Sequence, residues 1–216
     1  MQDIWQHLAL VDVIHNYRAP GSVYPDYFLL PSTPKPNLAY YYVTSWLSYL
    51  FELETANKVV LSIYILTFPL SFLYLLRSFG RSKWLSLFAF PLTYNAMFAY
   101  GFVAFVMGMP LLLAGVGAYR RFMDEPIDAP FSRHGWLSAA AFVLAFFVHA
   151  HIYLLMGMLC FTLWILASPR HAVGQGPAHL ASHPVPGLFR SVVRGLFHPA
   201  HPFHVRHDVW VPRQVL

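Results

Sequence analysis

The stretch VVLSIYILTFPLSFLYLL, residues 59–76, decides the fold class of this chain. It contains no charged residue and lies between Lys58 and Arg77. At 1.5 Å per residue, a helix over these residues extends about 27 Å, close to the ~30 Å hydrocarbon core of a bilayer. We therefore predict a membrane-spanning helix, with a kink at Pro69 because proline removes a backbone hydrogen bond.

Two longer runs without Asp, Glu, Lys or Arg follow, at residues 84–119 and 136–168. As single helices they would measure about 54 and about 50 Å, well beyond the thickness of a bilayer. Each run is therefore expected to turn back on itself as a hairpin of one short and one longer helix. The expected break points are Tyr94-Asn95 and Gly101 in the first run, and His149-Ala150-His151 in the second.

The composition excludes an ordinary soluble domain. Of the 216 residues, 57% are hydrophobic and only 11% are charged, whereas a soluble domain carries about 25% charged residues. The net charge of +5 comes from scattered basic residues, so there is no nucleic-acid signature. The single cysteine, Cys160, excludes a disulfide within the chain and is expected to be a buried apolar residue. We predict an all-α, polytopic membrane protein with about five membrane-inserted helices among its lipids.

Residues 1–58 are expected to lie outside the bilayer. Residues 4–17 predict a short amphipathic helix, because Ile4, Leu8 and Val11 recur at helical spacing. No basic start or long apolar core marks a signal peptide at this end.

The rest of this N-terminal segment is rich in proline and aromatic residues. Five prolines within residues 19–36 predict an extended loop without regular helix or central strand. Residues 38–51 are apolar, but a helix of that length spans only about 21 Å. An interfacial or re-entrant helix is therefore expected there.

Residues 169–216 hold seven His, seven Pro and five Arg but a single acid, Asp208. This composition predicts a basic cytoplasmic tail that is soluble or disordered, with residues 186–197 as a candidate helix lying on the membrane. The histidines are irregularly spaced and lack a partnering cysteine or acidic cluster, so no metal site is predicted.

The basic residues favour hairpins over single spans. If both long runs turn back, residues 77–83, residues 120–135 and the tail share one side and contain eleven of the 14 basic residues. If each run crossed once, that side would keep only eight. Cytoplasmic segments are enriched in Lys and Arg, so the hairpin arrangement of residues 59–168 is preferred.

The order of these elements resembles a known family. It begins with Asp3 and His7 in a D-x-x-x-H pattern and ends at LAFFVHAHIYLLMG, residues 144–157. Between them come PKPNLAYYYVTSWLSYL (34–50), LYLLRSFGRSK (73–83) and AFPLTYNAMFAYGFVAFVMGMPLLL (89–113). Over roughly residues 1–168 the chain resembles the N-terminal membrane module of GT-C class glycosyltransferases and their uncharacterised bacterial relatives. Members usually have a spanning helix before the external loop and further spans after this module, so we expect the chain to be incomplete.

The resemblance implies a transfer of sugar from a polyprenyl-phosphate donor at the external face of the cell membrane, without a cofactor. In such enzymes a carboxylate of the first external loop accepts the proton of the acceptor. Asp3 is the candidate base, and His7 lies on the same helix face, where it would orient Asp3 or contact phosphate. The alternative is that Asp3 caps the helix and His7 is an interfacial polar residue. Two neighbouring ligands are too few for a structural metal site.

His149, His151 and Asn95 are the candidate substrate-binding residues. Imidazoles within an apolar run are costly and often functional, and these two would face the donor phosphate. They share a face only if the helix breaks between them. The alternative for all three residues is a structural role at the turns.

Two non-catalytic functions remain open at the level of sequence. One is a truncated or degenerate relative that serves as a scaffold in envelope assembly. The other is a small transporter, for which broken helices would be suitable. However, the runs at 59–119 and 136–168 contain no intramembrane carboxylate that could couple ions.

Overall fold

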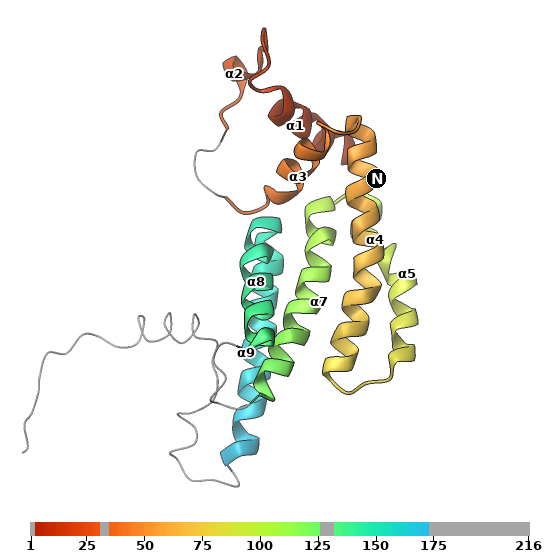
Figure 1. The fold of residues 1–216 in the computed structure, drawn as a ribbon, viewed down its shortest axis with the longest axis vertical. Coiled ribbons are helices and arrows are strands. Elements are labelled where there is room, and N and C mark those ends of the chain that lie inside the picture. Colours follow the sequence, from red (N-terminus) through yellow and green to blue (C-terminus); the bar gives the residue numbers. More distant parts are fainter. Residues whose placement is uncertain (1–2, 31–34, 126–131, 173–216) are drawn as a thin grey trace, which may run out of the picture. The chain divides into compact units, whose positions relative to one another are not determined.

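The computed structural model describes residues 3–30, 35–125 and 132–172, all within one unit of the chain, Met1–Pro184. The described residues form helices joined by turns, with no strand among them (Figure 1). The predicted all-α class is confirmed. Most of the predicted tail, including the candidate helix at 186–197, lies outside the described residues.

In the described part of the chain, three helices are long and apolar enough to cross a membrane: α4 (Leu53–Ser78), α7 (Val103–Met123) and the part Ala150–Ala167 of α9 (Ala150–Ala172). A fourth apolar helix, α8 (Arg133–Val148), is shorter. Helix α4 begins before the predicted stretch and continues through Pro69. These lengths and compositions make the chain an all-α membrane protein.

The first long uncharged run breaks at both predicted points. It forms η1 (Lys83–Phe88), α5 (Ala89–Thr93), α6 (Ala96–Tyr100) and then α7. Asn95 begins α6 by accepting a hydrogen bond from the N–H of Phe98 at 3.0 Å. Gly101 ends α6 with φ at 94°, a conformation that glycine adopts without steric cost.

This run returns to the end of α4 from which it started. It leaves α4 through Gly80, and the hydroxyl of Tyr64 in α4 donates to the carbonyl of Thr93 at 2.9 Å. After the Gly101 turn, α7 runs back along α4. Near the end of α7, Nε of Arg121 donates a hydrogen bond to Oγ of Ser78, the last residue of α4, at 3.0 Å. The predicted hairpin is therefore confirmed: the short helices η1, α5 and α6 form its first arm and α7 forms its second arm (Figure 1).

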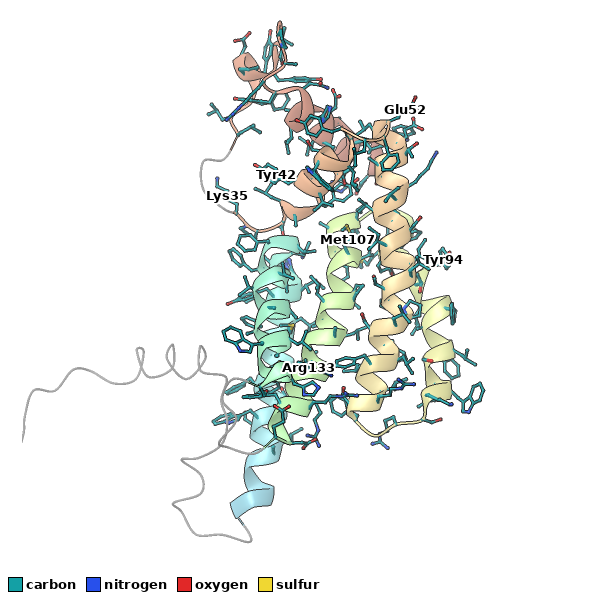
Figure 2. All side chains as sticks on the ribbon, viewed as in Figure 1. Lys35, Tyr42, Glu52, Tyr94, Met107 and Arg133 are labelled. Atoms are coloured by element: carbon teal, nitrogen blue, oxygen red, sulfur yellow. The ribbon has the colours of Figure 1, made fainter. Side chains whose placement is uncertain are left out.

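The second long run also breaks where the sequence predicts. His149 separates α8 from α9 in an extended conformation, with φ −162° and ψ 122°. The two helices then fold against each other, and the rings of Phe142 and Tyr153 lie 4.4 Å apart. The start of α8, marked by Arg133, lies at the same end of the bundle as the end of α7. The start of α4, marked by Glu52, lies at the opposite end (Figure 2).

Helix α7 is the centre of the bundle, because it packs against α4, α8 and α9. Glycine allows the close approach: a Cβ at Gly108 would lie 2.7 Å from Cγ1 of Ile152, and one at Gly115 would lie 2.6 Å from Sδ of Met156. Both positions face α9, so the lack of a side chain at these glycines allows α7 and α9 to approach this closely.

The N-terminal segment rests on one end of this bundle. Helix α1 (Ile4–Asn16) buries Ile4, Leu8 and Val11, as its spacing predicts. It packs with α3 (Ala39–Leu47) and the first halves of α4 and α7 around a shared apolar cluster.

Two expectations for this segment need correction. The proline-rich stretch contains a one-turn helix, α2 (Tyr24–Tyr27), although it was expected to have none. Pro25 lies in the first turn, where the missing N–H would have no helical partner in any case. The apolar segment 38–51 is also less helical than expected, because α3 ends at Leu47.

Candidate functional site

Asp3 is positioned by backbone contacts at the start of α1. Its N–H donates to the carbonyl of Tyr100 at 3.1 Å. A Cβ at Gly101 would lie 3.2 Å from the backbone nitrogens of Asp3 and Ile4, so only glycine permits this close approach. Although Asp3 occupies the N-cap position, its side chain makes no capping hydrogen bond. The carboxylate therefore accepts no hydrogen bond from the first turn of α1, and the alternative that Asp3 serves as a helix cap is not supported.

His7 lies one helical turn after Asp3 and contacts α3. Its Nδ1 is 2.7 Å from the hydroxyl of Tyr41, and its ring lies edge-on to Tyr40 with centroids 5.9 Å apart. Burial lowers the pKa of His7, while the negative charge of Asp3 opposes that change. The imidazole is thus mainly neutral near pH 7, with a tyrosine hydroxyl that sets its orientation.

The other carboxylates of the N-terminal segment have different surroundings. Asp12 accepts hydrogen bonds from the hydroxyl of Tyr24 at 2.5 Å and from the amide of Asn16 at 2.8 Å. The hydrogen bond from Tyr24 to Asp12 and the negative charge of Asp12 raise the pKa of Tyr24. Asp26 lies in the exposed helix α2. Asp12 therefore has a structural role in holding α2 against α1.

The break between α8 and α9 is held by a segment more than a hundred residues away. Asn37, with φ at 65°, accepts a hydrogen bond from the N–H of Ala150 through Oδ1 at 2.9 Å. The N–H of Leu38 donates to the carbonyl of Phe147 at 3.2 Å. These bonds satisfy backbone groups that a break in an apolar helix would otherwise leave unpaired.

His149 and His151 lie side by side at this break. Their ring centroids are 5.3 Å apart, and the N–H of His151 donates to Nδ1 of His149 at 3.3 Å. His151 is exposed, whereas His149 is half-buried and lies edge-on to Phe105 at 5.5 Å. The extended backbone at His149 brings the two imidazoles together, so the helix break that a joint role needs is present.

Asn95 is occupied by its own turn. Its Oδ1 accepts from the N–H of Phe98 at 3.0 Å, and its Nδ2 donates to the carbonyl of Leu92 at 3.1 Å. Both halves of the amide thus serve the connection between α5 and α6. The geometry favours the structural alternative for this residue and does not bring it together with the histidines.

The start of α7 lies between Asp3 and His7 on one side and the two histidines His149 and His151 on the other. The Gly101 turn lies against Asp3, and Phe105 lies against His149. Four helical residues correspond to about 6 Å along the axis. Asp3, His7, His149 and His151 therefore lie at one end of the bundle, beside the start of α7.

Sequence reasoning missed two residues that shape this end. Tyr41 binds His7, and Asn37 holds the break before Ala150. Three consecutive tyrosines at 40–42 are visible in the sequence, but only the register of α3 decides which one meets His7. For Asn37, the signal was an asparagine directly after a proline-rich stretch, where a left-handed conformation is common.

Within residues 3–30, 35–125 and 132–172, no three His, Cys, Asp or Glu side chains gather closely enough to hold a metal ion. The histidines of the tail beyond residue 172 lie outside the described residues. Comparisons with protein-family models, with curated proteins and with solved structures find no match to this chain.

Proposed function

We propose that this chain is the membrane module of a GT-C-like glycosyltransferase, which uses a polyprenyl-phosphate-linked sugar at the external face of a bacterial plasma membrane. The observation that carries this proposal is the position of Asp3. Its carboxylate is free of the helix cap, lies beside a neutral histidine, and occupies the end of an apolar helical bundle. A lipid-linked donor places its sugar and phosphate at such an end while its chain stays among lipids.

The proposed reaction assigns a role to each residue. An acceptor hydroxyl attacks the anomeric carbon of the donor sugar, and the bond between that carbon and the phosphate oxygen breaks. Asp3 accepts the hydroxyl proton, and polyprenyl phosphate leaves with the bonding electrons. His7, held by Tyr41, orients the acceptor or Asp3. His149 and His151 contact the phosphate from the break between α8 and α9.

Asp3→Asn tests this assignment. We expect the variant to lose sugar transfer about 10²–10⁴-fold, the usual cost of losing a general base, with unchanged expression because Asp3 makes no capping bond. The assay follows radiolabel from polyprenyl-phosphate-linked hexoses or pentoses, presented one at a time to membrane vesicles containing the chain. Asp26→Asn, in the exposed helix α2, is the matched control.

Two results would contradict the proposal. Transfer by Asp3→Asn at the rate of the Asp26→Asn control would remove Asp3 from catalysis. A wild-type chain that transfers none of the sugars would favour the non-catalytic scaffold.

A further inference from the structure

The opposite end of the bundle contains a positioned arginine that the proposed function does not use. The guanidinium of Arg121 in α7 lies over the ring of Tyr74 in α4, with Cζ 4.7 Å from the ring centroid. Its Nε donates to Oγ of Ser78 at 3.0 Å, and that hydroxyl in turn donates to the carbonyl of Tyr74 at 2.8 Å. One face and one nitrogen of the guanidinium are therefore held by α4.

A glycine makes this arrangement possible. A Cβ at Gly117 would lie 3.0 Å from Cδ1 of Tyr74 and 3.2 Å from Oγ of Ser78. Any larger residue would push α4 away from α7 at the level of Arg121. The site is thus defined by two spanning helices in close contact and does not depend on the reach of a flexible side chain.

The terminal nitrogens of Arg121 have no acceptor among the described residues. The nearby acids pair with other groups: Asp124 pairs with Arg120, and Oε1 of Glu125 lies 2.6 Å from Nδ1 of His134. Oε2 of Glu125 is buried and has no hydrogen bond to Arg121 or to any other described residue. The hydroxyl of Tyr74 is shielded from solvent and also lacks a hydrogen-bond partner within the described part of the chain. Two unfilled donor groups and a hydroxyl therefore remain beside the contact between α4 and α7.

Further positive charge surrounds this point. Arg77 lies in the last turn of α4, Arg81 and Lys83 follow shortly after its end, and all three are exposed. Because these residues end or follow helices long enough to span a bilayer, they lie where lipid phosphates are found. A planar guanidinium can bind two oxygens of a phosphate at once, whereas an ammonium acts as a point charge.

We propose that Arg121, held by Tyr74 and Ser78 between α4 and α7, binds the phosphate of an anionic phospholipid headgroup. The flanking basic residues supply net attraction, and the fork of Arg121 supplies geometric selectivity. This inference concerns the end of the bundle opposite Asp3 and is independent of the proposed sugar transfer. A general preference of basic residues for the cytoplasmic side would require charge but no positioned fork.

Native mass spectrometry of the full chain in detergent, with added dioleoyl-phosphatidylglycerol or dioleoyl-phosphatidylcholine, tests this proposal. We expect the wild-type chain to retain phosphatidylglycerol preferentially and Arg121→Gln to retain it about tenfold less, as expected for the loss of a charge-assisted bond. Arg121→Lys, which keeps the charge and loses the fork, should fall clearly below the wild type. Arg18→Gln, an exposed arginine outside this cluster, should leave retention unchanged.

Thermal melting verifies that each variant is folded, and Arg121→Lys serves for the comparison if Arg121→Gln does not fold. Wild-type retention of phosphatidylglycerol by Arg121→Lys would overturn the role of the fork. Equal retention of the two lipids by the wild-type chain would overturn the selectivity. Inorganic phosphate that competes with phosphatidylglycerol at equal concentration would assign the site to a free phosphate and overturn the lipid assignment.

Discussion

Single residues at the two ends of the bundle differ in what holds them. Asp3 is placed by backbone contact with the Gly101 turn, whereas His7 is placed by its side chain through Tyr41. Arg121 is placed by an aromatic face and a serine. In each case the position depends on a contact with another part of the chain, so these residues are placed by tertiary contacts and not by their own helix alone.

The burial of His7 leads to a prediction about pH. The pKa of His7 is lowered from 6.5, first by burial and against the charge of Asp3. The unfolded chain therefore binds this proton more readily than the folded chain does. The contribution to stability is complete above pH 6.5 and is lost as the pH falls from there through the folded pKa.

We expect the melting temperature in detergent to fall between about pH 7.5 and about pH 5, and His7→Gln to reduce this fall. His15→Gln, on the same helix, is the control. An equal fall in the wild type and in His7→Gln would show that other groups cause the acid sensitivity.

At the scale of elements, α7 determines how closely the spanning helices approach. A Cβ at Gly108 would meet Cγ1 of Ile152 at 2.7 Å and its Cβ at 3.1 Å. Ile152 is fully buried and branched at Cβ, so it has little freedom to move away. Gly157 in α9 differs, because a Cβ there would lie 3.6 Å from Phe142, an ordinary contact.

We expect Gly108→Ala to destabilise the fold by about 1–3 kcal/mol, the usual cost of overpacking. Gly157→Ala should be neutral or slightly stabilising, because alanine is the better helix former. Thermal melting of both variants in the same detergent measures the difference. Equal melting temperatures would mean that α7 and α9 separate without cost.

Helix α3 exposes large aromatic side chains on the face that does not pack against the rest of the protein. It buries Tyr40 together with the polar Thr44 and Ser45, whereas Trp46 is 64% exposed and Tyr42 is 44% exposed. Leu50, just after the helix, is 68% exposed. An outward face of Trp, Tyr and Leu is stable where the surroundings are partly apolar, as at the boundary of a bilayer.

A spin label at residue 46 should therefore be relaxed more strongly by oxygen, which concentrates in lipid, than by a water-soluble nickel chelate. The measurement uses the chain in phosphatidylglycerol and phosphatidylcholine vesicles, with the single cysteine Cys160 replaced by serine. A label at Asp26, in the exposed helix α2, is the comparison and should show the opposite preference. A preference for nickel at residue 46 would place α3 in water.

For the whole molecule, the hairpins place the basic connections at one end. The contact between Arg121 and Ser78 brings the end of α7 to the end of α4. Two of the three segments that the positive-inside rule assigns to the cytoplasm, the one after α4 and the one after α7, thus begin close together, as the hairpins require.

We expect Ser82→Cys and Asp124→Cys, each in a Cys160→Ser background, to react with a membrane-impermeant maleimide from the same side. Thr55→Cys, at the start of α4, should react from the other side. Sealed vesicles of both orientations supply the measurement. Reaction of residues 82 and 124 from different sides would exclude the arrangement.

Much of the fold could be predicted from local properties. The length of each apolar run, compared with the thickness of a bilayer, determined that residues 84–119 and 136–168 must break. Polar and small residues within those runs then indicated where, at Asn95, Gly101 and His149. The buried face of α1 followed from helical spacing alone. These features depend only on neighbours in the chain, and so the sequence by itself determined them.

The tertiary structure decided which side chains meet. The partner of His7 is 34 residues away in the chain, and the asparagine that holds the α8–α9 break is 113 residues from Ala150. The outward orientation of α3 likewise depends on which of its faces meets α1, α4 and α7. The composition of the sequence and the spacing of its apolar residues cannot distinguish among such pairings. Each pairing depends on how the helices pack, and only the folded chain defines their relative positions.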